Sequence, residues 1–386
     1  MPGHVTKRGK SSWSVVVDLG RDPLTGKRRQ LWRSVKGTKR DAEALLVQLL
    51  HQRDHGIDEP VSKLTVGAWL ERWLSDSEPH NALKTQRTNA DIVRRHLIPV
   101  LGNVPLTKLK PVHVQSYLSG AMRNGRLDGK GGLSAKSAHR HYQVLHAALH
   151  RAVRLEVIAR NPADAVELPR VERKQFRALT PAEVRTVYGA ADATTHGPLV
   201  RLAVLTGLRQ GELLGLRWSD VDLGSAVLSV QQTLQAVPGK GISFRDAKTR
   251  SSRRNVALSA DTCAALRMQR GNQLSDRLAV GMHYEDRGLV FQTPLGTPMD
   301  PSNVRRAWRS IVKKANIGHI RFHDLRHSHA SLMLAAGTNI KIVSERLGHA
   351  STAITGDIYA HVLPGMQAAA AEQLDRLLAV PIAEAG

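Results

Sequence analysis

The segment at residues 323–361, HDLRHSHASLMLAAGTNIKIVSERLGHASTAITGDIYAH, constrains the fold more than any other part of the chain. His323 and Arg326 lie three residues apart, so a helix through the following residues projects both side chains from one face. A glycine closes the second helical stretch and aims His349 just beyond the helix end. A third helical stretch carries Tyr359. The segment therefore predicts short helices that bring two histidines, an arginine and a phenol toward one point.

The charge of the whole chain limits its partners. The 386 residues carry a formal net charge of +23, and the 56 lysines and arginines are spread along the sequence instead of forming one tail. Such a surplus favours a polyanionic partner, with nucleic acid as the leading candidate. The sequence contains no apolar run of about 18 residues, no signal peptide and no basic amphipathic helix. We therefore expect a cytoplasmic, nucleoid-associated protein without membrane contact.

Few side chains of this sequence suit a metal or a disulfide. Cys263 is the single cysteine, which excludes an internal disulfide and a cysteine-based zinc cluster. Its apolar surroundings favour a buried structural role over that of a nucleophile. His146 and His150 stand at i, i+4, but no third ligand is spaced to complete a metal site, so core packing or phosphate contact is the preferred interpretation. We expect no metal and no other cofactor.

Residues 1–58 are predicted to form a small separate module. Two stretches of alternating apolar residues, 11–20 and 28–37, indicate strands joined by a turn, and residues 38–52 indicate an amphipathic helix. A basic sheet packed on a helix can lie in a DNA groove, and the alternative is a solvated strand face. The strand positions that we expect to contact DNA are Arg28, Arg29 and Arg33.

A polar linker at 56–63 leads into a second predicted domain, residues 63–165, in which the pattern is helical throughout. Trp69, Leu70 and Trp73 share one apolar face, and three further amphipathic stretches have basic flanks. These basic residues indicate phosphate contacts, although basic residues also solvate any helical surface. The candidates are Lys84, Arg87, Arg94, Lys136 and Arg140.

A third domain is predicted at residues 174–386, where the helix-start signal TPAE occupies 180–183. An apolar helix and a glycine turn then place Arg209 immediately before a short helix. Glu212, within that helix, is positioned to support the turn. Arg209 should therefore be well braced.

Beyond this helix, alternating apolar residues predict strands at 226–234 and 252–259, which belong to a small antiparallel sheet. Lys248 lies in the connection between them, near a β-turn. A lysine there can reach a ligand, but most loop lysines face water. Periodicity alone leaves both interpretations of Lys248 open.

The residue types suit transfer at a phosphodiester. Arginines are always charged and grip non-bridging oxygens in a bidentate manner, which stabilises the charge that grows at phosphorus. A tyrosine, with an ordinary pKa of about 10, needs a neighbour to accept its proton, and the leaving 5′ oxygen needs an acid. His323 and Lys248 have suitable pKa ranges for these steps.

The chain resembles the tyrosine recombinases, or phage-type integrases. The matching segments are TGLRQGELLGLRWSDVDL, AKTRSSRRNVAL, HDLRHSHASLMLAAG and LGHASTAITGDIYAH, in the order and spacing of the family. The resemblance implies a multidomain, mainly α fold with small β-sheets: an α+β arm-binding module, an all-α core-binding (SAM-like) domain and a mixed α/β catalytic domain. The catalytic residues that it implies are Arg209, Lys248, His323, Arg326, His349 and Tyr359, with Tyr359 as the nucleophile.

The same resemblance implies a site-specific integrase of a phage or integrative element. Tyr359 would attack a scissile phosphate and form a 3′-phosphotyrosyl intermediate, which the 5′ hydroxyl of a partner duplex then attacks, without ATP or metal. The implied partners are double-stranded attachment sites of core and arm type, a homotetramer on synapsed DNA, and a directionality factor or host DNA-bending protein. The tail at 363–380 is predicted to be a helix that docks on a neighbouring protomer or on its own subunit.

Three other functions compete with this interpretation. A resolvase or excisionase-type recombinase, or a type IB topoisomerase, would keep the chemistry and change the biology. A DNA-binding regulator would bind DNA without catalysis, and the full set of six residues argues against this function. A zinc hydrolase on His323 and His327 would need the glutamate of HExxH, which is missing here.

Overall fold

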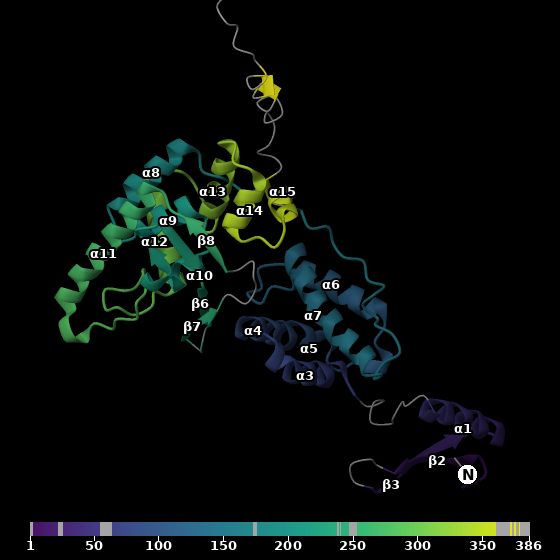
Figure 1. Ribbon diagram of the computed structural model, residues 1–386. Helices are drawn as coiled ribbons and strands as arrows, with labels where there is room; N and C mark the ends of the chain where they lie inside the picture. The colour runs from purple at the N-terminus through teal and green to yellow at the C-terminus, as the bar shows by residue number, and fades with distance from the viewer. Residues whose placement is uncertain are drawn as a thin grey trace, which may run out of the picture. The chain divides into compact units, whose positions relative to one another are not determined.

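The computed structural model describes residues 3–21, 26–54, 64–172, 176–237, 239, 241–246, 253–359, 371–372, 374–375 and 378; the side chains of residues 29, 48 and 51–54 lie outside this description. The chain divides into two compact units, residues 1–173 and the C-terminal unit, residues 174–386 (Figure 1). Within the described ranges, none of the helices has the length and apolar character needed to cross a membrane.

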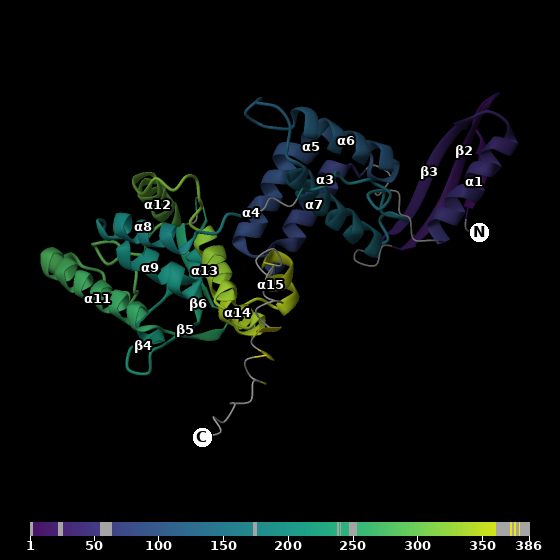
Figure 2. The ribbon, with the colours of Figure 1, turned by 90° about the horizontal axis from the view of Figure 1, so that it is seen from above.

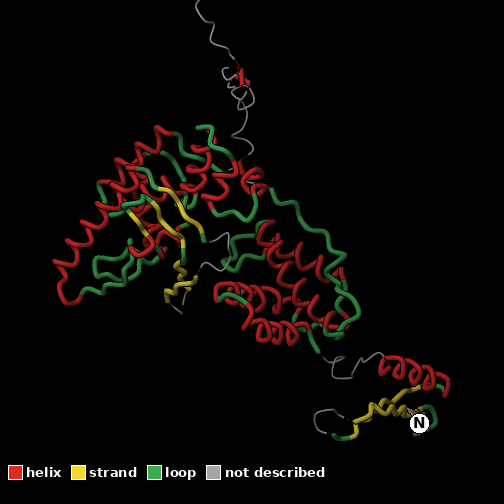
Figure 3. The backbone as a smooth tube through the Cα atoms, in the orientation of Figure 1, coloured by secondary structure: helices red, strands yellow, loops and turns green. Residues whose placement is uncertain are grey.

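The N-terminal module, residues 3–54, is a three-stranded antiparallel sheet with one helix lying across a face (Figure 3). Its elements are β1 (Gly3–Lys7), β2 (Ser12–Arg21), β3 (Arg28–Lys36) and α1 (Lys39–Asp54). The sequence predicted only two strands. β1 is a short edge strand with a single large apolar residue, Val5, so it lacks the alternation that indicates a strand.

The sheet register corrects the predicted position of one basic residue. Arg33 of β3 pairs with Val15 of β2, which is fully buried in the core under α1. Side chains of an antiparallel pair point to the same face, so Arg33 lies on the helix-covered face and is half-buried. The exposed Trp32 occupies the open face instead. The alternation of side chains along β3, and not their charge, decides which residue lies on the open face of the sheet.

The helical region, residues 64–172, is built around two buried tryptophans. Trp69 is fully buried, and its indole N–H donates to the carbonyl of Ala148 at 2.8 Å, which ties the first helix to the last. The helices are α3 (Val66–Ser77), α4 (Leu83–Ile92), α5 (Ile98–Leu101), α6 (Pro111–Asn124) and α7 (Ala135–Arg154), with a π-helical turn η2 (Val93–Leu97) and 3₁₀ turns η1 (Glu78–His80) and η3 (Leu106–Lys108).

The C-terminal unit is mainly helical. Its helices are α8 (Pro181–Asp192), α9 (Gly197–Thr206), α10 (Gln210–Gly215), α11 (Ala260–Val280), α12 (Pro301–Ala315), α13 (Asp324–Ala335), α14 (Ile340–Leu347) and α15 (Thr352–Tyr359), with 3₁₀ turns η4 (Trp218–Asp220) and η5 (Gly281–His283). α11 runs along the outer edge of the unit, while α13, α14 and α15 lie side by side (Figures 1 and 2). The predicted start of α8 is confirmed, because Thr180 and Glu183 form a capping box.

Two small sheets complete this unit. One contains β4 (Val221–Asp222), β5 (Val227–Val230) and β8 (Arg254–Ala257), in the order β4-β5-β8, and the other pairs β6 (Gln232–Val237) with β7 (Gly241–Asp246). The predicted strand 226–234 is therefore wrong as one element, because its two halves join different sheets. Part of the predicted connection is itself a strand, β7, and Lys248 lies outside the described residues. The predicted fold class is confirmed.

Candidate active site

The turn between α9 and α10 positions the first candidate catalytic arginine. Gly207 ends α9 with φ 65°, and an added Cβ would lie 2.6 Å from the ring of His329 and 2.8 Å from Leu347, so glycine is required. Arg209 follows as the N-cap of α10, and its backbone N–H donates to the Glu212 carboxylate at 2.9 Å. The Arg209 guanidinium donates to the same carboxylate at 2.8 Å. One anion thus fixes both the backbone and the side chain of Arg209.

Glu212 is the buried anion of the site. Its side chain and that of Arg254 are each 7% exposed, and the guanidinium of Arg254 donates to both carboxylate oxygens, at 2.9 and 3.2 Å. Burial opposes ionisation of Glu212, but the hydrogen bonds and charges of Arg254 and Arg209 outweigh it and lower the pKa of Glu212 to about 2. The carboxylate is therefore ionised at neutral pH, as two neighbouring arginines require.

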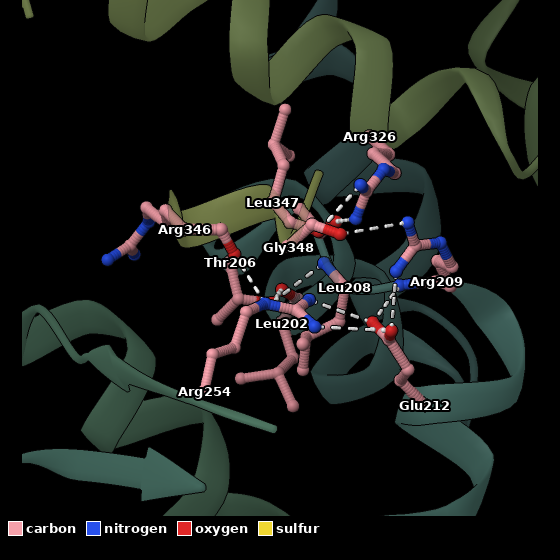
Figure 4. Close-up of polar contacts among 11 residues, drawn as sticks. Leu202, Thr206, Leu208, Arg209, Glu212, Arg254, Arg326, Arg346, Leu347 and Gly348 are labelled. Carbon is pink, nitrogen blue, oxygen red and sulfur yellow. Dashed lines mark hydrogen bonds and ion pairs between the residues drawn. The ribbon is translucent and has the colours of Figure 1, made fainter. Parts of the chain in front are cut away.

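The C-terminal end of α14 gathers three arginines (Figure 4). Residues 346–348 offer three successive carbonyl oxygens: Arg254 donates to the first at 2.7 Å, Arg326 to the second at 2.6 Å and Arg209 to the third at 3.3 Å. Carbonyls at a helix end lack intrahelical donors and carry the negative end of the helix dipole. This helix end therefore draws together guanidinium groups from three distant parts of the sequence.

Arg326 is the most deeply buried of the candidate cations. It lies in the first turn of α13, is 4% exposed, and donates to the carbonyl of Gly207 at 2.8 Å as well as to the α14 end. Burial, and next the charge of Arg209, lower the pKa of Arg326 to about 9. Arg326 is still charged at neutral pH. A desolvated guanidinium of this kind attracts a phosphate more strongly than one in water.

Two histidines flank the arginines. His349 comes directly after the left-handed Gly348, and its Nδ1 lies 2.8 Å from the hydroxyl of Thr355 in α15. Burial and the charges of Arg326 and Arg209 lower the pKa of His349 to about 4. His323, the exposed N-cap of α13, also has a lowered pKa, first because protein surrounds part of the ring and next because of Arg326.

Tyr359 lies at the end of α15 and is 1% exposed. Its phenol oxygen lies 2.8 Å from Nδ1 of His327, whose ring stacks on Phe176 at a centroid distance of 4.4 Å. Burial raises the pKa of Tyr359 to about 12, although the charge of Arg326 acts in the opposite direction. The structure thus brings five of the six predicted catalytic residues into one unit, around the ends of α9, α13 and α14. The sixth, Lys248, lies outside the described residues.

Sequence reasoning missed several partners of these residues. Arg254, which bonds Glu212 and the α14 end, is one of two adjacent arginines in an expected strand, and nothing local marks it. Phe176 stands in the polar stretch 167–177, which precedes α8 and has no periodic pattern. The position of His327, one turn after His323 on the same helix, was the available signal for its role beside Tyr359.

The predicted DNA-contacting residues differ in their environments. Arg28 forms an ion pair with Asp18 at 2.6 Å, and Arg94 forms one with Glu71 at 2.8 Å. Both pairs lie on the surface. Arg140 donates to Asn89 at 3.2 Å. Lys84, Arg87 and Lys136 are exposed, and the side chain of Arg29 lies outside the described residues.

No three His, Cys, Asp or Glu side chains of the described ranges gather closely enough to hold a metal ion. His146 lies 2.8 Å from Asp164, through its Nε2, and packs beside the ring of His150 at 6.2 Å. His323 and His327 pack edge to face at 5.2 Å.

The chain matches known families over most of its length. The model of the phage integrase family matches residues 177–365, and the model described as phage integrase, N-terminal SAM-like domain, matches residues 65–122. A tyrosine recombinase XerC-like protein of Caldanaerobacter subterraneus subsp. tengcongensis is 28% identical over 97% of this chain and 98% of its own. An integrase of Streptomyces ambofaciens is 30% identical over 91% of this chain and 89% of its own.

Solved structures share the fold. The Tn1549 transposon integrase, in complex with a circular intermediate DNA, superposes with a TM-score of 0.68 at 22% identity, over 81% of this chain and 99% of that chain. A lambda integrase tetramer bound to a Holliday junction gives a TM-score of 0.56 at 20% identity, over 91% of this chain and 97% of that chain. At these identities the likeness concerns the fold.

Proposed function

The chain belongs to the phage integrase family of tyrosine recombinases, and on that premise we propose that Tyr359 is its nucleophile and that Arg209 and Arg326 bind the scissile phosphate. The protein is a site-specific DNA recombinase that cuts and rejoins DNA through a 3′-phosphotyrosyl intermediate. The observation that carries the assignment of residues is the end of α14, where Arg209 and Arg326 converge, with Tyr359 on the next helix.

The chemistry follows from these positions. The two guanidinium groups stabilise the charge that grows on the non-bridging oxygens in the transition state. The phenol of Tyr359 gives its proton to His323 as its oxygen forms a bond to phosphorus, the bond from phosphorus to the 5′ oxygen breaks, and the leaving oxygen takes up a proton from Lys248. The covalent link conserves the energy of the phosphodiester, so the proposed reaction needs no ATP. The two guanidinium groups stabilise the charge that a metal ion would otherwise stabilise, so no metal is needed in this proposal. A second 5′ hydroxyl then attacks the phosphotyrosine and reverses the chemistry.

The remaining candidates have supporting roles in this proposal. His349 lies between the arginine cluster and α15, where it donates to a phosphate oxygen and anchors Thr355. His323, at the start of the same helix as Arg326, accepts the proton of the Tyr359 phenol near the phosphate. Lys248 is assigned as the acid for the 5′ oxygen on the strength of the sequence resemblance alone.

The rest of the chain is proposed to bind DNA. We assign residues 1–58 to arm-type sites and residues 63–165 to core-type sites, and residues 174–386 to catalysis. Four protomers act on two synapsed duplexes, as the lambda integrase tetramer on a Holliday junction suggests. The net charge of +23 fits this large polyanionic partner. The proposed setting is the nucleoid of the cytoplasm, with a directionality factor or a DNA-bending protein as accessory partner.

The experiment that tests the proposal starts from binding-site selection on random DNA, followed by footprinting to define the core site. A core-site duplex with a nick next to the scissile phosphate then traps the covalent intermediate, because the short leaving strand diffuses away. We expect a protein–DNA adduct in the presence of EDTA and without ATP. Footprinting without any adduct would instead indicate a DNA-binding regulator. Relaxation of a supercoiled plasmid that lacks the core site would indicate a topoisomerase.

A further inference from the structure

Arg254 is a buried arginine whose bonds stay within the C-terminal unit. It is the first residue of β8, and its side chain is 7% exposed. Its guanidinium donates through Nη1 and Nη2 to the two carboxylate oxygens of Glu212, at 3.2 and 2.9 Å, and through Nε to the carbonyl of Arg346, at 2.7 Å. Each of its three nitrogens therefore faces a protein oxygen, and a buried side chain held in this way does not itself bind DNA.

The two partners of Arg254 also hold the proposed phosphate-binding arginines (Figure 4). Glu212 accepts from the guanidinium of Arg209 at 2.8 Å, through the same Oε1 atom that Arg254 contacts. The end of α14 accepts from Arg326 at 2.6 Å, one residue after the carbonyl that Arg254 uses. Arg254 thus joins the carboxylate that orients Arg209 to the helix end that orients Arg326.

Arg254 also shares the negative charge of Glu212. Arg209 and Arg254 both lie against this one carboxylate, so the positive charge of the group exceeds its negative charge. The side chain of Arg209 is 42% exposed and that of Arg254 is 7% exposed, so only Arg209 can turn toward a ligand. Because Arg254 occupies both oxygens of Glu212, part of the charge of Arg209 stays available for a phosphate.

We propose that Arg254 is a positioning residue for phosphate binding, which holds Glu212 and the end of α14 in a fixed relation so that Arg209 and Arg326 meet at one phosphate. This inference rests on the proposed function, in which those two arginines bind the scissile phosphate. The planar guanidinium suits this role, because its rigid fork sets both the distance and the orientation of its partners. Arg254 therefore affects cleavage through the charge of the phosphate, and not through the nucleophile or the leaving group.

Arg254→Lys tests this role while it keeps a buried counter-charge for Glu212. A single ammonium group cannot reproduce the three bonds of the planar fork, so Arg209 and Arg326 should lose their alignment. Arg201→Lys is the matched control, because Arg201 is another ion-paired arginine of the same unit. Its Nε donates to Asp192 at 3.0 Å, and its Cζ lies 4.5 Å from the ring centroid of Tyr188. Both of these partners belong to α8.

Two nicked core sites separate a positioning role from a general loss of structure. One carries the ordinary scissile phosphate, and the other carries a methylphosphonate, in which a methyl group replaces one non-bridging oxygen and removes the negative charge. Arg254→Lys should slow single-turnover cleavage of the ordinary site by about 30-fold or more, because misaligned donors stabilise the growing charge poorly. On the methylphosphonate its rate should stay within about threefold of the wild-type rate, because less charge grows there. Arg201→Lys should cleave both sites at rates close to those of the wild type.

A double-mutant cycle with Arg209 gives a second measurement, on the ordinary site alone. Because Arg254 is proposed to act through Arg209 and the end of α14, adding Arg254→Lys to Arg209→Lys should slow cleavage by no more than about fivefold. The same change in the wild type should slow cleavage far more. This cycle decides the question even where the wild type cleaves the methylphosphonate too slowly to measure.

Equal slowing of Arg254→Lys on the two substrates would overturn the inference, because the loss would then be independent of the phosphate charge. Full additivity in the cycle, or a wild-type rate of Arg254→Lys on the ordinary site, would overturn it as well. Arg209→Lys tests the proposed function separately. If Arg209→Lys alone cleaves the ordinary site at the wild-type rate, the proposed phosphate site is wrong; if it is slow while Arg254→Lys is not, only the role of Arg254 is refuted.

Discussion

Two tyrosine–histidine pairs of this chain have nearly the same geometry and different proposed roles. In the helical region, the Tyr117 oxygen lies 2.7 Å from Nδ1 of His141; in the C-terminal unit, the Tyr359 oxygen lies 2.8 Å from Nδ1 of His327. Burial raises the pKa of both phenols and lowers the pKa of both imidazoles to about 4. A buried phenol with a histidine partner therefore does not by itself indicate a nucleophile.

The surroundings separate the two pairs. Tyr117 lies in the middle of α6, and His141 packs on the ring of His96 at 4.5 Å. Tyr359 ends the described part of α15, and the charge of Arg326 acts on its phenol. The charge of a neighbouring guanidinium group is therefore the feature that separates the proposed nucleophile, Tyr359, from Tyr117.

The largest difference between the two pairs is expected when the phenol oxygen of each is removed. Tyr359→Phe should abolish adduct formation on the nicked core site, because the attacking atom is gone, while binding of the site persists. Tyr117→Phe should form adduct at a rate close to that of the wild type. It should lower the free energy of unfolding by about 1–2 kcal/mol, because His141 loses its buried partner. Gel analysis of adducts and thermal melts measure the two outcomes, and adduct formation by Tyr359→Phe would remove the distinction between the pairs.

The second prediction concerns the guanidinium group of Arg326, a neighbour that Tyr359 has and that Tyr117 is proposed to lack. Arg326→Lys keeps a positive charge but cannot grip phosphate oxygens in a bidentate manner, so single-turnover cleavage should slow by about 100-fold to 1000-fold. Arg346→Lys is the matched control, since Arg346 also donates to two backbone carbonyls, those of Ala257 and Leu205. The control should lose stability with far less effect on cleavage. Equal losses in both variants would indicate a packing role for Arg326.

A third prediction compares two ion-paired glutamates, Glu212 in the C-terminal unit and Glu71 in the helical region. Glu212 is 7% exposed and holds Arg254, so Glu212→Ala leaves buried positive charge and should cost about 3 kcal/mol of the free energy of unfolding. Glu71→Ala breaks the surface pair with Arg94 and should cost less than about 1 kcal/mol. Denaturant titration measures both. A similar cost at both sites would contradict the claim that the arginine cluster depends on a buried counter-charge.

The last prediction concerns pH and is shared by the two pairs. His141 and His327 have pKa values of about 4 in the folded chain, below the ordinary value of about 6.5, so the folded state favours the neutral imidazoles. Their contribution to stability is complete above about pH 6.5 and is lost as the pH falls through about 4. The melting temperature should therefore decrease over this window. His141→Asn should flatten the decrease, and an unchanged pH profile would show that burial of His141 is not linked to folding.

The sequence predicted much of this architecture because the decisive signals are local. The capping box of α8, the left-handed Gly348 after α14 and the placement of Arg209 before α10 are each encoded within a few residues. The order of helices in the C-terminal unit follows from such signals. The fold class, which depends on them, was predicted correctly.

The contacts that were not predicted join distant segments. Arg254 reaches the end of α14 across 92 positions of the chain, and Arg326 reaches Gly207 across 119. No spacing rule anticipates which carbonyl will receive a given arginine. The position of Arg33 under α1 depends on strand register, which the predicted hairpin did not define. Local pattern together with the family resemblance thus indicated the candidate catalytic residues, while their orientation depends on tertiary packing.

The most direct test of the account identifies the atom that is joined to DNA. Wild-type protein is trapped on the nicked core site, digested with trypsin and nuclease, and analysed by tandem mass spectrometry. The account predicts that the nucleotide remnant is attached to Tyr359 through the 3′ phosphate of the cleaved strand. Attachment to another residue, or to the 5′ side of the break, would contradict it.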